Sequence, residues 1–331
     1  MKYLITGGAG FIGSNFIRYF FNKYPDMSII NLDKLTYSGN LENIRDFMKN
    51  KNYIFVKGDV CDGKLVNKIM KNIDVVIHFA AATHVDRSIL SSGVFVKTDV
   101  LGTQTLLEAA KINNVKKFIH ISTDEVYGNV LRGYADENYP LKPSSPYSAS
   151  KAGADRLAYA YYATYKLPVI ITRSSNNYGP YQHPEKFIPL FITNAMENMP
   201  MPLYGNGLNK RDWLHVKDNC EAIDLVLNRG IDGEVYNIGS EEESSNIEIA
   251  KNILKILKKS YSLIKFVKDR PGHDIRYAIN CHKIKKLGWR PKVKFEKGLK
   301  NTIKWYSENR NWWRAIKKGS FKSYYKKQYS L

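Results

Sequence analysis

Residues 2–33 decide the fold, and they read KYLITGGAGFIGSNFIRYFFNKYPDMSIINLD. An apolar strand leads into Gly7, Gly10 and Gly13, a helical pattern follows, and a second apolar strand ends at Asp33. Glycines at this spacing permit a tight turn and let main-chain N–H groups at a helix N-terminus approach a pyrophosphate. Because the glycines lie between a strand and a helix, the stretch predicts a dinucleotide-binding βαβ unit rather than a chance triplet.

The carboxylate of Asp33 also indicates which dinucleotide is bound. It lies about 20 residues after the last glycine, where an acidic side chain accepts hydrogen bonds from ribose hydroxyls. Since a carboxylate repels a 2′-phosphate, we predict NAD rather than NADP as the cofactor. The neighbouring Lys34 carries the opposite charge and argues in the other direction.

The same alternation of strands and helices continues through the first half of the chain. Apolar segments that indicate strands are followed by segments with a helical pattern. The expected strands are 52–60, 75–81, 117–122 and 168–174, and the expected helices are 91–112 and 147–165. Strict alternation predicts an α/β fold with a doubly wound, parallel, Rossmann-type sheet that binds ligands at the carboxyl ends of its strands.

After residue 175 the sequence becomes richer in Pro and Gly and its elements become shorter. We therefore expect a dinucleotide-binding domain over residues 1–175 and a smaller, mainly substrate-binding lobe over 176–315. Some segments of that lobe, such as 216–227, are expected to return to the sheet. Residues 316–331 form a basic, aromatic tail.

Composition places the chain among globular proteins. The hydrophobic content is 44%, and the sequence has neither an apolar run long enough to span a membrane nor a signal-peptide pattern at its start. We therefore expect a cytoplasmic protein with no membrane partner. The cysteines, Cys61, Cys220 and Cys281, lack the spacing of metal ligands, so we expect no metal.

The formal net charge of +20 raises the question of a polyanionic partner. Basic residues interleaved with Trp and Tyr, as in the tail, can bind single-stranded nucleic acid. The lysines are nevertheless spread along the whole chain, and charge runs of this kind are more often solvated faces. We therefore do not expect a nucleic-acid partner, and we expect truncation after Lys318 to leave turnover unchanged.

The residues that indicate chemistry lie between Ser122 and Lys151, in STDEVYG and YSASK. Tyr147 and Lys151 are one helical turn apart, so the ammonium group can favour the phenolate form of the tyrosine. Asp124 and Glu125 follow an apolar strand and suggest proton transfers beyond a simple hydride exchange. Either motif alone also arises by chance or as a helix cap, and the glycine motif upstream is what favours the catalytic interpretation.

These motifs, together with LDKLTYSGNL, HVDRS, TRSSNNYGPYQHPEKFIP, PLYGNG, RDWLHV and DRPGHD, resemble the dTDP-glucose 4,6-dehydratases of the extended short-chain dehydrogenase/reductase superfamily. The resemblance runs from Met1 to about Trp313. The narrower assignment depends on Asp124 and Glu125, since sugar epimerases of the same fold usually have small or hydroxyl residues there. Ala82 departs from the family, which usually has Glu at this position.

The resemblance implies a role for each matching residue. Thr123 contacts the C4 hydroxyl of the hexose, Asp124 is a general acid, Glu125 a general base, Tyr147 the base for oxidation, and Lys151 its partner. The implied NAD-binding residues are Gly7, Gly10, Phe11, Ile12, Gly13, Asp33, Lys34, Leu35, Thr36, Asp59, Val60, Ala80, Ala81, Thr98, Tyr147, Lys151 and Asn177. The implied nucleotide-sugar-binding residues are Thr83, Thr123, Asn176, Lys186, Phe187, Pro202, Leu203, Tyr204, Arg211, Asn246, Asp269, Arg270, Pro271, Gly272 and His273.

The implied reaction converts dTDP-glucose to dTDP-4-keto-6-deoxyglucose with loss of water and no net consumption of NAD, in a homodimer. Three alternatives stay open at this point. A 4,6-dehydratase that acts on UDP-glucose or another nucleotide sugar would use the same residues, and a nucleotide-sugar 4-epimerase would share the fold and Tyr147. A non-catalytic NAD- or nucleic-acid-binding protein would need neither Tyr147 nor Lys151.

Overall fold

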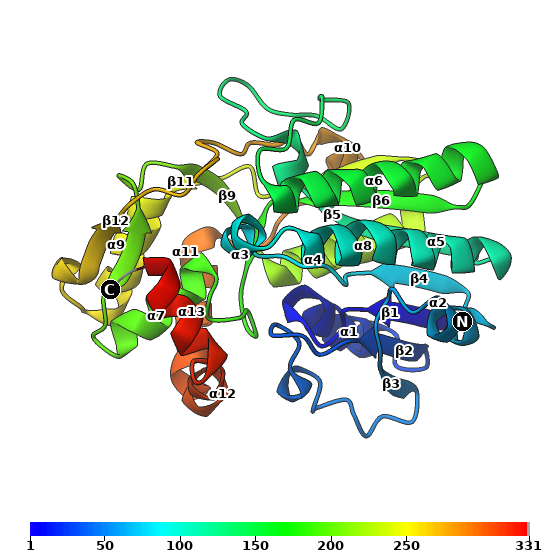
Figure 1. The fold of residues 1–331 in the computed structure, drawn as a ribbon, viewed down its shortest axis with the longest axis horizontal. Helices are drawn as coiled ribbons and strands as arrows, with labels where there is room; N and C mark the ends of the chain where they lie inside the picture. Colours follow the sequence, from blue (N-terminus) through cyan, green and yellow to red (C-terminus); the bar gives the residue numbers. More distant parts are fainter. Residues whose placement is uncertain (330–331) are drawn as a thin grey trace.

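The computed structural model describes residues 1–329 and has a central seven-stranded parallel sheet, on the right in Figure 1, joined to a smaller lobe on the left. The strand order is β10-β6-β5-β4-β1-β2-β3. The strands of this sheet are β1 (Lys2–Thr6), β2 (Ser28–Asp33), β3 (Tyr53–Lys57), β4 (Val75–His78), β5 (Lys117–Thr123), β6 (Val169–Ser174) and β10 (Val235–Ile238). The predicted doubly wound α/β fold is confirmed.

Two of the expected strands end earlier than the sequence pattern indicates. β3 ends at Lys57 rather than at residue 60, and β4 ends at His78 rather than at residue 81. The residues that follow each strand line a cavity instead of continuing the sheet. Apolar composition alone does not distinguish a strand from the apolar loop that follows it.

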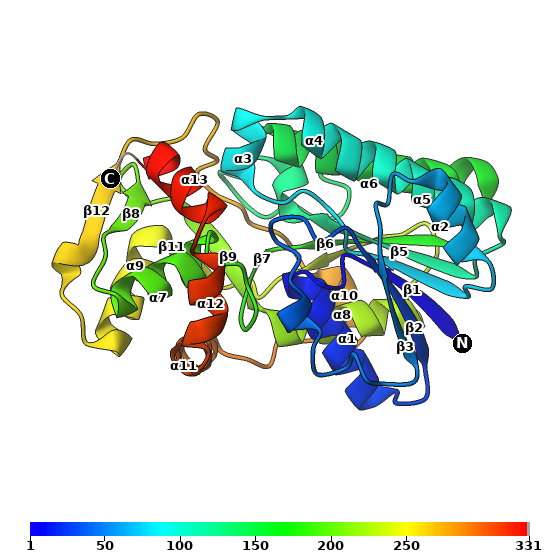
Figure 2. The ribbon, with the colours of Figure 1, turned by 60° about the horizontal axis from the view of Figure 1, so that its bottom comes forward.

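Helices cover both faces of the sheet, as Figure 2 shows. One face carries α2 (Gly63–Met70), α5 (Gly102–Ile112) and α6 (Pro146–Tyr165), and the other carries α1 (Phe11–Lys23), α8 (Val216–Arg229) and α10 (His282–Lys286). Each face has its own apolar core. Phe16 and Phe20 of α1 pack in one core, and Leu106 of α5 packs in the other.

The helix expected over residues 91–112 is divided. It contains α4 (Gly93–Phe95), a π-helical segment (Val96–Leu101) and α5, and it follows the short α3 (Val85–Leu90). π-helical turns within α-helices are often found at functional sites. Here the π-helical segment contains Thr98, which lines the cofactor-side cavity.

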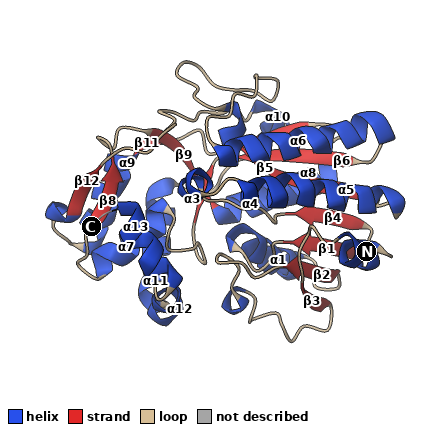
Figure 3. Cartoon of the chain, viewed as in Figure 1, coloured by secondary structure: helices blue, strands red, loops and turns tan. Residues whose placement is uncertain are grey.

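The second lobe is built from short strands and several helices, coloured by type in Figure 3. Its small sheets contain β7 (Asn176–Tyr178), β8 (Met201–Tyr204), β9 (Lys210–His215), β11 (Glu243–Ser245) and β12 (Ile264–Val267). Its helices are α7 (Phe187–Met196), α9 (Asn246–Leu257), α11 (Phe295–Glu308), α12 (Arg310–Ile316) and α13 (Ser320–Tyr329). The segment that begins at Val216 forms α8, whose Ile223 and Val226 pack in the same apolar core as α1, and β10 then pairs with β6.

The C-terminal tail is packed rather than solvated. Trp313 is fully buried, and Phe321 and Tyr329 of α13 join the same apolar core as α7 and α9. The last two residues of the predicted tail, 330 and 331, lie outside the described part of the chain. Within residues 1–329, no helix combines the length and apolar character needed to cross a membrane.

A buried ion pair fastens α6, the helix of Tyr147 and Lys151, to the sheet. Arg173 of β6 donates through Nε and Nη2 to the two carboxylate oxygens of Asp155, each at 2.8 Å. Its Nη1 donates to the Tyr127 hydroxyl, also at 2.8 Å. Burial alone would raise the pKa of Asp155, but the hydrogen bonds and charge of Arg173 lower it below its ordinary value.

We predict that Asp155→Asn lowers the free energy of unfolding by about 3–5 kcal/mol, because it leaves a buried guanidinium without its counter-charge. The measurement is urea denaturation near neutral pH. Since the pKa of Asp155 is depressed, its contribution is present above the ordinary carboxyl range and is lost as the pH falls below it. Glu296→Gln, which breaks the exposed ion pair with Lys300, is the control and should leave stability unchanged. An equal effect of both substitutions would contradict the prediction.

Candidate active site

The glycine turn after β1 lies against the backbone that follows β4. Gly7 has φ = 71°, and a Cβ atom there would lie 2.6 Å from the amide nitrogen of Ala80. A Cβ at Gly13 would lie 2.4 Å from the carbonyl oxygen of Gly7. Only glycine allows both approaches, and the resulting cradle at the N-terminus of α1 fits a pyrophosphate.

The polar groups after β2 fit a ribose with free hydroxyls. The Asp33 carboxylate accepts hydrogen bonds from the amides of Ala9 (2.9 Å) and Leu35 (2.8 Å) and still lines the cavity. Lys34 does not offer a free charge, because its ammonium pairs with Asp59 at 2.7 Å. The arrangement therefore suits NAD better than NADP, whose 2′-phosphate would meet a carboxylate and a neutralised lysine.

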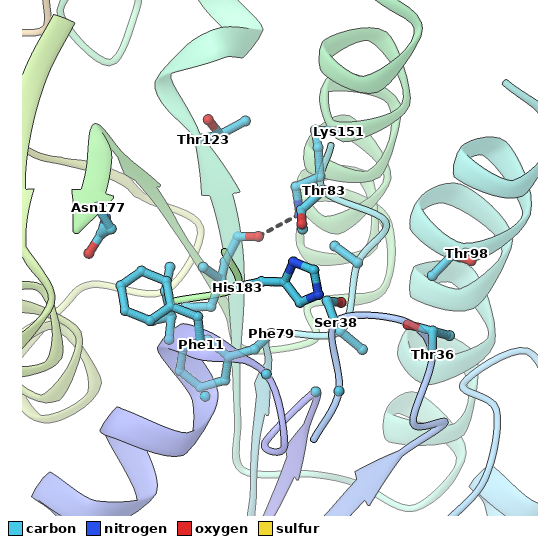
Figure 4. A pocket seen from close by; sticks show the side chains of 18 of the residues that line it. Phe11, Thr36, Ser38, Phe79, Thr83, Thr98, Thr123, Lys151, Asn177 and His183 are labelled. Atoms are coloured by element: carbon cyan, nitrogen blue, oxygen red, sulfur yellow. Dashed lines mark hydrogen bonds between the residues drawn. The ribbon is translucent and has the colours of Figure 1, made fainter. Parts of the chain in front are cut away.

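A single cavity collects almost every residue predicted for the cofactor. Figure 4 shows it from close by, with Thr36, Thr98, Lys151 and Asn177 arranged around it. The predicted cofactor residues that line it are Gly7, Gly10, Phe11, Ile12, Gly13, Asp33, Lys34, Thr36, Asp59, Val60, Ala80, Ala81, Thr98, Tyr147, Lys151 and Asn177. Leu35 does not line it. Its backbone has φ = 54° and its amide is turned to Asp33, so it supports the loop rather than the cavity wall.

The paired acids lie where β5 ends at the floor of this cavity. The Thr123 hydroxyl accepts the Glu125 amide N–H at 3.3 Å and so caps a short 3₁₀ turn that contains both acids. Asp124 is 2% exposed, and its Oδ2 has no hydrogen-bond partner within the described residues. Burial, followed by the charge of Glu125, raises the pKa of Asp124 well above its ordinary value.

Glu125 has a different electrostatic environment from its neighbour. Burial raises its pKa, but the positive charges of Arg270, Arg211 and Lys186 oppose that rise. Its Oε2 also accepts a hydrogen bond from the Tyr277 hydroxyl at 3.4 Å. Burial therefore raises the pKa of both carboxyls, but nearby cations oppose the rise more at Glu125 than at Asp124, and such a difference between neighbouring carboxyls suits general acid and base catalysis.

Tyr147 and Lys151 share a buried face of α6, as expected, but the predicted effect of the lysine on the phenol is wrong. The Lys151 ammonium donates to the Ile121 carbonyl at 2.6 Å, and burial lowers its pKa. Burial and the charges of Glu125 and Asp99 raise the pKa of Tyr147 well above its ordinary value. Desolvation and neighbouring carboxylates outweigh the helical spacing on which the prediction depended.

A second cavity adjoins the first and shares Glu125 and Lys186 with it. It contains most of the residues predicted for the nucleotide sugar. Those that line it are Thr83, Asn176, Lys186, Phe187, Pro202, Leu203, Tyr204, Arg211, Asn246, Arg270 and His273. Asp269, Pro271 and Gly272 do not line it, and Asp269 instead pairs with Nδ1 of His273 at 2.6 Å.

The cations of the second cavity are suited to an anionic ligand. Arg211 is 5% exposed and donates to the carbonyls of Lys210 and Asp274, while Lys186 donates to the carbonyl of Thr83. Arg270 pairs with Asp86 at 3.2 Å, and its Nε has no hydrogen-bond partner in the described chain. These buried, incompletely neutralised charges fit a diphosphate.

Sequence reasoning missed several residues that form the walls. Glu185 lines both cavities, and Tyr277 bonds to Asp274 at 2.6 Å as well as to Glu125. Asp86 accepts a hydrogen bond from Tyr204 at 2.8 Å, and Tyr329 of the C-terminal helix lines the second cavity. Asp86 and Glu185 lie within quoted motifs and could have been proposed from them, but Tyr329 had no such signal.

Known proteins of similar sequence and fold support this interpretation of the site. A family model described as GDP-mannose 4,6 dehydratase matches residues 4–302. A dTDP-glucose 4,6-dehydratase of Streptomyces niveus is 50% identical over 322 residues, which cover 96% of each chain. The crystal structure of the dTDP-glucose 4,6-dehydratase DesIV of Streptomyces venezuelae, with NAD and TYD bound, superposes with a TM-score of 0.94 at 48% identity, covering 96% of this chain and all of that one.

An epimerase of the same fold is more distant. UDP-glucuronic acid 4-epimerase of Bacillus cereus superposes with a TM-score of 0.88 at 30% identity, covering 93% of this chain and 99% of that one. The shared fold therefore does not separate the two reaction types, whereas the degree of identity does. The chain belongs to the family that the matched model describes and, within it, to the dTDP-glucose 4,6-dehydratases.

Proposed function

We propose that this protein converts dTDP-glucose to dTDP-4-keto-6-deoxyglucose with loss of water, using NAD that is oxidised and reduced within each cycle. The observation that carries the proposal is the adjacent pair of acids, buried Asp124 and partly buried Glu125, of which Glu125 lines both the cofactor-side and the substrate-side cavity. A 4-epimerase has no need for both acids, because it transfers no proton at C5 or C6.

The first half-reaction oxidises C4 of the hexose. Thr123 and Tyr147 line the same cavity, so the C4 hydroxyl can contact both, and Tyr147 removes its proton. NAD, when bound, supplies a cationic nicotinamide ring that accepts a hydride from C4 and later returns it to C6. Lys151, held by the Ile121 carbonyl, lines the same cavity one helical turn from Tyr147 and would contact the nicotinamide ribose.

The second half-reaction eliminates water across C5 and C6. The 4-ketone acidifies the C5 proton, and Glu125 removes it as the base. Asp124, whose pKa is raised well above its ordinary value by burial and by the charge of Glu125, delivers a proton to the departing C6 hydroxyl. General acid and base groups of this kind typically raise the reaction rate ~10²–10⁴-fold each. Contributions of this size allow the elimination to follow the oxidation at a useful rate.

The remaining contacts position the nucleotide. Arg211, Arg270 and Lys186 would hold the diphosphate, and the aromatic and apolar wall that includes Tyr204 and Phe187 would hold the base. That wall is compatible with thymine and with uracil, and a UDP-sugar is the second candidate substrate. The 48% identity to DesIV, which is a dTDP-glucose dehydratase, supports thymine.

We also propose a homodimer in the cytoplasm. Exposed apolar side chains gather on α3 and on the helix that follows it, including Leu90, Val94, Val96 and Leu101, and a second copy would cover them. Each is at least 48% exposed in the isolated chain. The free cysteines support a reducing compartment.

The direct test is incubation of the purified protein with dTDP-glucose or UDP-glucose. We expect turnover of dTDP-glucose without added NAD, because the cofactor is regenerated in each cycle and has no need to leave. The 4-keto-6-deoxy product is measured by its absorbance in alkali. Faster turnover of UDP-glucose would change the substrate assignment, and strict dependence on added NADP would contradict the interpretation of Asp33.

We predict that Glu125→Gln and Tyr147→Phe block different half-reactions. Glu125→Gln keeps the size of the side chain but removes the base, so product formation should fall at least about 10²-fold while reduced cofactor accumulates. Tyr147→Phe should show neither product nor reduced cofactor, because oxidation does not begin. Both are followed by the absorbance of reduced cofactor in a single turnover. Near-normal product formation by Glu125→Gln would overturn the role of the acid pair.

We also predict that product formed in deuterated water carries deuterium at C5. Glu125 exchanges the proton it has removed with solvent before a proton is returned to C5, whereas C6 receives the original C4 hydrogen. Mass spectrometry and NMR of the product locate the label. A product without solvent deuterium would show that the elimination step is wrongly assigned.

A further inference from the structure

Arg87 of α3 is enclosed between two aromatic rings and an acid. Its guanidinium carbon lies 4.0 Å from the ring centroid of Tyr37 and 4.2 Å from that of Tyr324. Its Nε donates to Oε2 of Glu185 at 2.9 Å. A planar guanidinium is suited to this arrangement, because it can stack on two faces while it donates at its edge.

The partners of Arg87 come from three different segments of the chain. Tyr37 lies in the loop after β2, between Thr36 and Ser38, which both line the cavity. Glu185 lies in the loop before α7 and lines the cavity from the other lobe. Tyr324 belongs to α13 at the C-terminus. One side chain therefore connects the dinucleotide-binding domain, the substrate lobe and the tail.

A second contact joins the same segments. The ring of His183, which also lines the cavity, lies 5.5 Å from Tyr37 edge to face and 6.2 Å from Phe321 of α13. Burial lowers the pKa of His183 to about 3, so it is neutral. Arg87 then forms the ion pair with Glu185, whose side chain is only 1% exposed.

The charge of Glu185 makes this contact costly to break. Its Oε1 has no hydrogen-bond partner among the described residues, and its Oε2 pairs with Arg87 at 2.9 Å. Separating the two lobes would break the ion pair of Arg87 with Glu185 and expose the face of Tyr324 that Arg87 covers. The contact therefore favours a closed arrangement of the two loops that border the cavity.

We propose that Arg87 is a positioning residue that latches the cofactor-side cavity closed and slows the release of NAD. The proposal rests on the function above only in that NAD is the ligand of this cavity. The latch suits a reaction that restores its cofactor in every cycle, since slow exchange then costs no turnover. Removal of α13 after Lys318 would remove Tyr324, so truncation there should speed the release of NAD.

The test measures how fast bound NAD leaves. Wild-type protein and variants are loaded with radiolabelled NAD, excess unlabelled NAD is added, and the label that stays bound is followed by rapid filtration. Arg87→Met and Tyr324→Leu should each release NAD about tenfold faster than the wild type. Arg87→Lys, which keeps the charge but loses the planar stack, should be intermediate. Tyr324→Phe should match the wild type, because the Tyr324 hydroxyl has no hydrogen-bond partner within residues 1–329.

Arg18 provides a matched control. Its guanidinium lies 4.2 Å from the Tyr181 ring and 5.3 Å from the Phe47 ring, and it pairs with Asp46 at 2.5 Å. These partners do not line the cofactor-side or substrate-side cavity. Arg18→Met therefore removes a similar stacked ion pair and should leave the rate of NAD release unchanged.

The outcomes separate this proposal from the proposed function. Unchanged release in both Arg87→Met and Tyr324→Leu, in a protein that binds NAD and turns over, would overturn the latch alone. Equal acceleration in Arg18→Met would also overturn it, since general loosening would then explain the effect. A wild-type protein that binds no NAD would overturn both proposals. Tyr324→Leu lies outside the central sheet, so it keeps the test informative if Arg87→Met fails to fold.

Discussion

The approach of the glycine turn to the neighbouring strand is the constraint on which the rest of the structure depends. Gly7 follows β1 and Ala80 follows β4, and a Cβ on Gly7 would lie 2.6 Å from the Ala80 amide nitrogen. β1 and β4 are neighbours at the place where the strand order reverses, which is where open α/β sheets bind ligands. The close packing therefore sets where the cofactor-side cavity opens. β5 lies next to β4, so its end, at Thr123, borders the same cavity.

Burial of charge then determines the chemistry. Asp124 and Glu125 are adjacent, yet burial and mutual repulsion act mainly on Asp124, while Arg270, Arg211 and Lys186 offset the effect on Glu125. The same cations that would bind a diphosphate therefore also keep the base ionisable. Substrate binding and proton transfer share one electrostatic environment, so a change in one of these cations alters both.

The features that depend on residues close together in the sequence could be predicted from the sequence. The glycine turn, most strands, the Tyr147–Lys151 face and the position of the acids at the end of β5 follow from periodicity and spacing. Properties that depend on contacts between segments far apart in the sequence could not be predicted in this way. The high pKa of Tyr147 arises from its burial and then from the charges of Glu125 and Asp99, which lie on other elements. Leu35, Asp269, Pro271 and Gly272 belong to motifs that reach the cavities, but they do not themselves line either cavity.

The C-terminal tail shows why amino-acid composition alone can suggest the wrong role for a segment. The lysines and aromatic residues at the C-terminus are typical of a nucleic-acid-binding or solvated segment. The structure instead makes α13 an amphipathic helix with one buried face. Its lysines are exposed, whereas Phe321 and Tyr329 are buried and Tyr324 covers Arg87. A stack of this kind needs an aromatic ring more than 200 residues away from the arginine, so no local pattern could indicate it. The aromatic residues of the tail are explained by what they cover, and its lysines by the solvent that they face.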